Sequence, residues 1–331
     1  MTEKRRWLQP LLIFIVVLLL MLAPNMVGDY QLRLMTEAVV FSLYAVSFNM
    51  LLGYAGLLSF GHAMFFGVGA FATAVALEHI AGLPVLAAVA IATGFTAFVG
   101  FAVGMLLLRV KGTPFALLTL AFNALFYAIG VKWSSVTGGD DGLIVDLPDI
   151  NMGFCSLDLF DGPTVYYLTV IILGAAIAFC WFFTKTAMGQ SVLLIRENEE
   201  RMRFLGYNTH ISRLILFVFS GALAGLAGSF YAIMNSFVSL DAIAIEMSTK
   251  VLLMTFIGGI GHFFGPVLGA VFYTYFQNFL SELTDSWPLF MGLLFIAMVL
   301  WAPGGISKWI DSSWKWVLGR FGVESPSKRE E

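Results

Sequence analysis

The sequence predicts an all-α integral membrane protein, a polytopic bundle of about 8–10 transmembrane helices, some of them broken or re-entrant. Hydrophobic residues make up 59% of the 331 residues and charged residues only 12%, against roughly 45–50% and 25% in ordinary globular chains. Because so few charges cannot cover a surface that faces water, most of the outer surface must face lipid. The apolar segments also lack the alternation of barrel strands, which leaves helices as the spanning elements.

Each apolar run is judged against the length needed to cross a bilayer, since about 20 helical residues span a hydrocarbon layer of about 30 Å. The runs lie at about 8–27, 34–52, 62–79, 84–108, 113–131, 164–184, 212–235, 248–262, 265–281 and 288–303. The first run follows a basic segment, as in a signal peptide, but no small-residue cleavage site ends it, so we expect an uncleaved span. The eighth and ninth runs are short, and the alternative for them is a broken or re-entrant helix.

Glycines and one proline interrupt the membrane runs at two places. They are Gly53, Gly56 and Gly61 in the first, and Gly258, Gly259, Gly261, Gly265 and Pro266 in the second. Broken helices leave backbone N–H and C=O groups available to a substrate inside the membrane. We therefore expect these residues to shape the interior of the protein.

The distribution of charge predicts the orientation in the membrane. When the basic segment at residues 4–6 is placed in the cytoplasm, 15 of the 18 Lys and Arg residues fall on the cytoplasmic side. This asymmetry follows the positive-inside rule. The sequence therefore predicts a multi-pass membrane protein with both termini cytoplasmic, including a tail at residues 304–331.

Several classes of function are excluded by what the sequence lacks. The net charge is −3 and no basic patch occurs, so we expect no nucleic-acid partner. There are two cysteines, no H-E-x-x-H pattern and no Gly-Lys-Ser/Thr phosphate loop, so we expect no catalytic, cofactor or metal site. If the protein works with ATP, another chain must bind the nucleotide.

Polar residues are rare inside the runs, and charges are almost absent from their centres. The polar intrusions that we assign to a substrate pathway are Asn49, Ser59, His62, Thr119 and Asn123. Asn123 lies near the centre of the fifth run, with Thr119 one turn earlier on the same helix face. Ion-coupled carriers need buried carboxylates or a relay of titrating groups, and nothing here resembles such a site.

Two loops are large enough to bind other proteins. The outer loop, residues 132–163, contains Thr137, Gly138, Gly139, Asp140 and Asp141, a composition that is typical of a turn. The inner loop, residues 185–211, carries Glu and Arg residues three and four positions apart and then a glycine, which suits a short solvated helix. Such a helix is either a linker or a docking element, and its candidate docking residues are Arg196, Glu197, Glu200, Arg203 and Gly206.

In several segments the sequence resembles the permease subunits of branched-chain amino-acid ABC transporters. The matching blocks are residues 53–62, 65–70, 119–122, 137–143, 217–228 and 258–270. They cover most of the chain, from about residue 50 to residue 270. The inner loop is similar to the coupling motif of such permeases, Glu-Ala-Ala followed by Gly: Glu200 and Gly206 keep the spacing, while Arg201 and Met202 replace the alanines.

The resemblance implies that residues 1–331 form a single permease domain without a cofactor. It also implies four further subunits: a second permease, a paralogue in the family's usual arrangement, two cytoplasmic ATPases and a periplasmic binding protein. The inner loop would dock on an ATPase, and residues 137–141 would face the binding protein. ATP-driven movement of the inner loops would then rock the spans between two conformations.

Other interpretations remain open. An importer of urea or short-chain amides would have a very similar permease, because the binding protein can determine the substrate. A stand-alone channel or secondary carrier would transport without any ATPase. A membrane enzyme is disfavoured because no acid, base, nucleophile and metal converge in the sequence.

Overall fold

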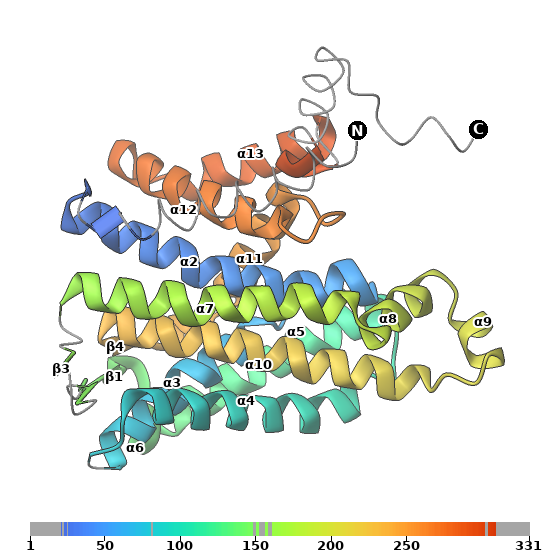
Figure 1. Ribbon diagram of the computed structural model, residues 1–331, viewed down its shortest axis with the longest axis horizontal. Coiled ribbons are helices and arrows are strands. Elements are labelled where there is room, and N and C mark those ends of the chain that lie inside the picture. Colours follow the sequence, from blue (N-terminus) through green and yellow to red (C-terminus); the bar gives the residue numbers. More distant parts are fainter. Residues whose placement is uncertain are drawn as a thin grey trace, which may run out of the picture.

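The structure, a computed structural model, describes residues 21, 23–24, 26–80, 82–147, 150–151, 156–157, 161–301 and 304–308. Helices dominate these residues, which confirms the predicted all-α polytopic fold (Figure 1). The α-helices are α2 (Asp29–Asn49), α3 (Ala63–His79), α4 (Val85–Leu107), α5 (Thr113–Lys132), α6 (Ser134–Thr137), α7 (Gly162–Lys185), α8 (Ala187–Glu197), α9 (Glu199–Phe204), α10 (Thr209–Asn235), α11 (Ile245–Gly258), α12 (Gly265–Leu283) and α13 (Trp287–Trp301). A π-helix, η1 (Met50–Ala55), continues α2, and two 3₁₀ turns are η2 (Gly139–Asp141) and η3 (Leu240–Ala242).

The predicted apolar runs from residue 34 onwards each correspond to a helix whose ends differ by a few residues. The first run, 8–27, and most of the tail at 304–331 lie outside the described residues. Within the described part, α2 with η1, α4, α5, α7 and α10 are long and apolar enough to cross a membrane, and α3 and α13 are shorter apolar helices. Helix α11 has 14 residues, or about 21 Å, which favours the broken-helix alternative for the eighth run.

Helix α2 occupies the centre of the bundle. It packs against α7, α10, α11 and α12, and Tyr44 and Phe48 in its second half are completely buried. Helix α10 packs in turn against α3 and α4. A side chain at Gly69 would collide with the backbone of α10, and one at Gly225 would collide with Thr96 of α4. Glycine thus permits the close helix contacts that hold a bundle together in lipid.

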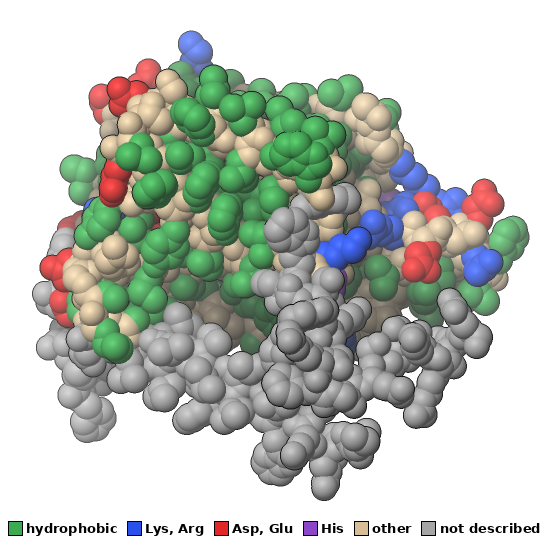
Figure 2. Space-filling model, turned by 90° about the horizontal axis from the view of Figure 1, so that it is seen from above, with side chains coloured by type: hydrophobic (Ala, Val, Ile, Leu, Met, Phe, Trp, Pro, Cys, Tyr) green, Lys and Arg blue, Asp and Glu red, His purple; other side chains and the backbone are tan. Residues whose placement is uncertain are grey.

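The surface of the bundle is apolar between two charged ends. Figure 2 shows hydrophobic side chains over the middle of one face, with acidic side chains at one end and mixed charges at the other. Phe98 of α4, Leu117 of α5 and Phe182 of α7 are each more than half exposed. Such large apolar areas are unusual on water-soluble monomers, and they mark the faces that contact lipid.

The two ends of the bundle differ in structure (Figure 1). One end, which we call the strand end, carries α6 and an antiparallel pair formed by β1 (Leu143–Ile144) and β4 (Phe237–Val238), in which Leu143 lies opposite Val238. A second pair, β2 (Ile150–Asn151) and β3 (Ser156–Leu157), is also antiparallel. The opposite end carries α8 and α9, and we call it the α8–α9 end.

Candidate functional site

The first candidate site is the interruption between α2 and α3, residues 50–62, which we call the α2–α3 break. The π-helix η1 ends at Ala55, and the next residue, Gly56, has a φ of 69°, which is left-handed and favours glycine. The chain then runs without helix to His62. A side chain on Gly61 would collide with the backbone carbonyl of Thr119, so this segment passes directly against α5.

Two polar side chains of α5 hold the surrounding segments in place. The backbone N–H of Phe60 donates to Thr119 Oγ1 at 3.0 Å. One turn along α5, Asn123 Nδ2 donates to the carbonyl oxygen of Ile243 at 2.8 Å. Both side chains are buried. The two predicted pathway residues of the fifth run thus connect α5 to the break and to the segment that precedes α11.

The other predicted pathway residues lie in or beside the break. His62 Nε2 is 2.9 Å from Ser47 Oγ, and its ring stacks against the ring of Tyr44. Asn49 is the last residue of α2, and Ser59 stands in the segment without helix. The structure therefore brings the five predicted residues together around one interruption, although they are spread over 75 positions of the sequence.

Four polar atoms of this group have no hydrogen-bond partner among the described residues: Asn49 Oδ1, Ser59 Oγ, His62 Nδ1 and Asn123 Oδ1. A buried polar atom without a partner costs about 1–3 kcal/mol. Each of the four residues is at most 2% exposed, so they lie in the packed interior and not along an open path. Only a movement of the break would bring these atoms into contact with a substrate.

The second candidate site is the interruption between α11 and α12, residues 259–264, which we call the α11–α12 break. Gly259 has a φ of 103°. A side chain on Gly258 would collide with the backbone of Gly265, and one on Gly269 would collide with the carbonyl of Met254. Helices α11 and α12 therefore form a tightly packed antiparallel hairpin, as the predicted glycine-rich interruption requires.

The two breaks meet inside the bundle. A Cβ on Gly53 would lie only 3.2 Å from the carbonyl oxygen of Ile260, so the π-helix η1 passes close to the α11–α12 break. Pro266 stands in the first turn of α12, where its missing N–H has no intrahelical partner to lose. Gly261 differs from the other predicted glycines of the two breaks, because nothing lies within 4 Å of the position of its Cβ.

The third candidate site is the helix pair at the α8–α9 end. The charged stretch predicted as one short helix is divided at Asn198, whose backbone is extended and whose side chain accepts a hydrogen bond from the N–H of Arg201 at 2.9 Å. An Asn in this position is a strong N-cap, so it ends α8 and begins α9. The predicted helical character is thus retained in two shorter helices.

Glu199, the first residue of α9, joins this helix pair to the bundle. Its carboxylate forms salt bridges with Lys111 at 2.6 Å, Arg203 at 2.6 Å and Arg213 at 2.8 Å, and we call these four residues the Glu199 cluster. Partial burial raises the pKa of the Glu199 carboxyl, but the hydrogen bond from Lys111 and the charge of Arg213 outweigh burial and bring the pKa to about 2. The cluster therefore fixes α9 to the α4–α5 loop and to α10.

Sequence reasoning named Arg203 and missed the other three members of the cluster. The spacing of four between Glu199 and Arg203 was a visible signal for that pair. Lys111 and Arg213 gave no such signal, because they approach Glu199 only after α4, α5 and α10 have packed.

The predicted coupling residues divide into two groups. Arg196 does not point away from the bundle: its guanidinium donates to the carbonyl oxygen of Gly53 in η1. Glu197 and Glu200 are exposed and form no salt bridge with another described residue. Gly206 follows α9 with a φ of 86° and open space around it. Arg196 thus connects the helix pair to the α2–α3 break and Arg203 belongs to the Glu199 cluster, while Glu197, Glu200 and Gly206 are left accessible.

Apolar side chains are exposed beside these charges. Phe204 is 90% exposed, Leu205 66% and Tyr207 51%. They lie at the end of α9, outside the span α10 that follows. An exposed apolar group of this kind, surrounded by charged residues, is typical of a protein interaction site.

The predicted outer-loop residues also divide into two groups. The hydroxyl of Thr137 donates to the carbonyl of Gly130 at 2.6 Å and accepts from the N–H of Gly139 at 3.2 Å. Gly138 and Gly139 both have positive φ values, so these residues build the turn. Asp140 and Asp141 are exposed. These two carboxylates are the part of the loop that a partner at the strand end would contact.

The fold defines a polytopic membrane protein, and its candidate sites are two interrupted helices and a helix pair outside the bundle. No group of three or more His, Cys, Asp or Glu side chains that would hold a metal ion occurs in the described part of the chain. The chain belongs to the family described as the permease component of branched-chain amino acid transport systems, whose model matches residues 30–301. The family resemblance predicted from the sequence blocks is confirmed.

Individual relatives cover most of the chain at low identity. The high-affinity branched-chain amino acid transport system permease protein LivM of Escherichia coli strain K12 is 26% identical over 317 residues, which cover 89% of this chain and 74% of the relative. The galactose/methyl galactoside import permease protein MglC of Salmonella typhimurium is 26% identical over 300 residues, covering 81% and 85%. The autoinducer 2 import system permease protein LsrC of Escherichia coli O9:H4 is 28% identical over 228 residues, covering 66% and 63%. No solved structure matches the chain significantly.

Proposed function

We propose that the chain is the membrane-spanning permease subunit of an ATP-binding-cassette importer that takes up branched-chain amino acids. The observation that carries this proposal is the family match over residues 30–301. The similarity to LivM supports the substrate class, because it extends over 89% of the chain. The whole chain, residues 1–331, acts as one permease domain in a bacterial inner membrane, with both termini in the cytoplasm.

In this proposal two cytoplasmic ATPase subunits supply the energy, and a second permease subunit, a paralogue, completes the membrane part. The ATPase contacts the α8–α9 pair, where Glu197, Glu200 and Phe204 are exposed. A periplasmic binding protein delivers the substrate to the strand end, where Asp140 and Asp141 are exposed. The Glu199 cluster supports this role, because it makes the helix pair a firm part of the bundle and not a loose linker.

A movement of the α8–α9 pair can be transmitted directly to the interior of the bundle. Arg196 of α8 is hydrogen-bonded to Gly53 of η1, and η1 begins the α2–α3 break. A displacement of α8 by an ATPase therefore displaces the segment around which Asn49, Ser59 and His62 are buried. Exposure of those polar atoms in one of two conformations would give alternating access to a zwitterionic substrate.

Two other substrate classes compete with branched-chain amino acids. The similarity to MglC, a galactose/methyl galactoside permease, supports a sugar, and importers of urea or short-chain amides have similar permeases. A stand-alone channel or carrier is the alternative of another class.

Reconstitution separates these functions. We expect the chain alone in vesicles to concentrate nothing, and the transporter with its ATPases, ATP and binding protein to accumulate leucine, isoleucine or valine. Concentrative uptake by the chain alone would refute the ATP-driven permease. Accumulation of galactose or urea in place of leucine would refute the substrate class but leave the permease function standing.

A further inference from the structure

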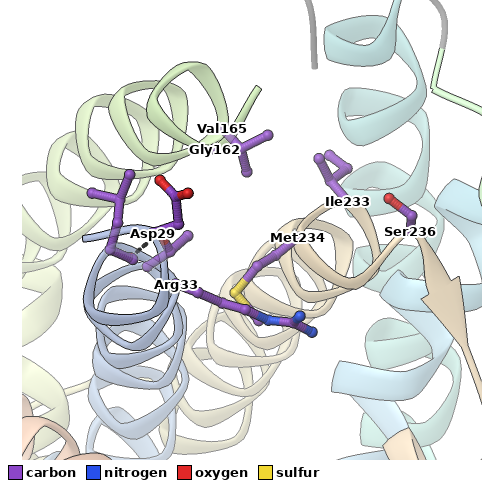
Figure 3. Close-up of a pocket in the computed structure, with 9 residues that line it drawn as sticks. Asp29, Arg33, Gly162, Val165, Ile233, Met234 and Ser236 are labelled. Atoms are coloured by element: carbon purple, nitrogen blue, oxygen red, sulfur yellow. Dashed lines mark hydrogen bonds between the residues drawn. The ribbon is translucent and has the colours of Figure 1, made fainter. Parts of the chain in front are cut away.

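A cavity of about 220 Å³ lies at the strand end of the bundle. It is partly open to the outside and is lined by the beginnings of α2 and α7 and by the end of α10 (Figure 3). Since a water molecule occupies about 30 Å³ in the liquid, this space has the size of a small organic molecule.

Two opposite charges line the cavity without neutralising each other. Asp29 and Arg33 are four residues apart on α2, yet neither forms a salt bridge with another described residue. The guanidinium of Arg33 donates instead to Asn235 Oδ1 at 3.0 Å, which draws it towards α10. Figure 3 shows the carboxylate of Asp29 on the side of α7 and the guanidinium of Arg33 extending past Met234. The cavity therefore presents an anion and a cation at separate positions.

The remaining lining is largely apolar. Leu32, Val165, Ile233 and Met234 contribute aliphatic and thioether groups to the lining, beside Thr36, Gly162 and Ser236. Ligand sites commonly combine an apolar lining with a few polar groups that fix orientation. A guanidinium recognises a carboxylate, a carboxylate recognises an ammonium, and the apolar wall accepts an aliphatic side chain. One small molecule carries all three features: an aliphatic α-amino acid in its zwitterionic form.

We infer that this cavity is an entry site for an aliphatic amino acid, which binds with its carboxylate at Arg33 and its ammonium at Asp29. The inference rests on the proposed function, because it places the imported substrate on the outer side of the permease. It adds a site to that function: the permease itself selects zwitterions, in addition to any selection by the binding protein.

The charges continue from the cavity into the bundle. Glu37 stands four residues beyond Arg33 on α2, and it lies within electrostatic reach of both Arg33 and Lys250 of α11. Charges of alternating sign therefore follow α2 inwards.

Binding to the assembled transporter in nanodiscs, without the binding protein, tests the site. Saturation-transfer NMR is measured with leucine, with leucine amide, which lacks the carboxylate, and with 4-methylpentanoate, which lacks the ammonium. We expect leucine to bind roughly 1.5-fold to fivefold more tightly than either analogue, as partly exposed charge pairs allow. Arg33→Gln should abolish the preference for leucine over its amide, and Asp29→Asn should abolish the preference over 4-methylpentanoate.

The matched control is Glu78→Gln, which removes an exposed carboxylate at the end of α3 and should leave the three affinities unchanged. Absence of leucine binding by the unmodified transporter, or retention of both preferences in the two cavity variants, would overturn the inference.

Uptake by the complete transporter distinguishes this failure from failure of the proposed function. If the unmodified transporter accumulates leucine while both variants keep its affinity and its half-saturating concentration, the entry site is wrong and the importer stands. If the unmodified transporter accumulates no amino acid, both the proposed function and the inferred entry site are wrong.

Discussion

Replacement of Glu199 by Gln tests whether the Glu199 cluster holds the helix pair to the bundle. The carboxyl has a pKa of about 2 where 4.5 is ordinary, which corresponds to roughly 3 kcal/mol at 1.36 kcal/mol per pKa unit. Its side chain is 15% exposed, and water at this surface weakens the cluster, since exposed ion pairs contribute only about 0.2–1 kcal/mol each. We therefore expect the substitution to lower the local free energy of opening by about 1–3 kcal/mol.

Hydrogen–deuterium exchange measures this opening directly. A loss of 1–3 kcal/mol corresponds to exchange of the α9 amides that is roughly fivefold to 150-fold faster. Glu200→Gln is the matched control, because Glu200 is the next residue and forms no salt bridge with a described residue. Unchanged exchange in Glu199→Gln, or equal acceleration in both variants, would refute the reasoning.

The same cluster predicts a dependence on pH. Because the pKa of Glu199 is lower in the folded protein than in the unfolded chain, its contribution is complete above about pH 4.5 and is lost as the pH falls towards about 2. The difference in α9 exchange between the unmodified protein and Glu199→Gln should therefore be constant near neutral pH and shrink across this acid range.

Four further substitutions test the two breaks and the turn at the strand end. Gly61→Ala forces a Cβ into a backbone carbonyl of α5 and should cost at least about 2 kcal/mol, seen as a lower thermal unfolding temperature in detergent, whereas Gly261→Ala meets open space and should change little. Arg196→Ala removes the hydrogen bond to Gly53, so ATP hydrolysis should continue while uptake per ATP falls; an unchanged ratio would contradict the proposed route. Thr137→Val removes the side-chain hydrogen bonds of the turn and should destabilise the loop by about 1–3 kcal/mol, measured as faster proteolysis there.

The helices were predictable because each depends mainly on a local property, an apolar run of sufficient length. The run at 113–131 became α5, Thr113–Lys132, and the run at 84–108 became α4, Val85–Leu107. The interruptions were predictable for a similar reason, since Gly56 and Gly259 supply backbone conformations that other residues rarely adopt.

The contacts between distant segments were not predictable from local patterns. Arg196 lies 143 positions from Gly53, the residue to which it is hydrogen-bonded, and Lys111 lies 88 positions from Glu199. The motif spacing predicted Glu200 as the important glutamate. In the packed structure it is Glu199 that joins the helix pair to the bundle. Periodicity cannot distinguish two adjacent glutamates when the difference between them depends on Lys111 and Arg213, which lie outside α9.

Helix α10 connects the two ends of the bundle. Arg213 near its beginning belongs to the Glu199 cluster, and β4, immediately after its end, pairs with β1 at the opposite end of the bundle. Its 27 residues form a lever about 40 Å long, with the tight glycine contact to α3 and α4 near its midpoint. If α10 tilts about this contact, its two ends move in opposite directions. Proteins bound at the two ends of the bundle would then be coupled through α10.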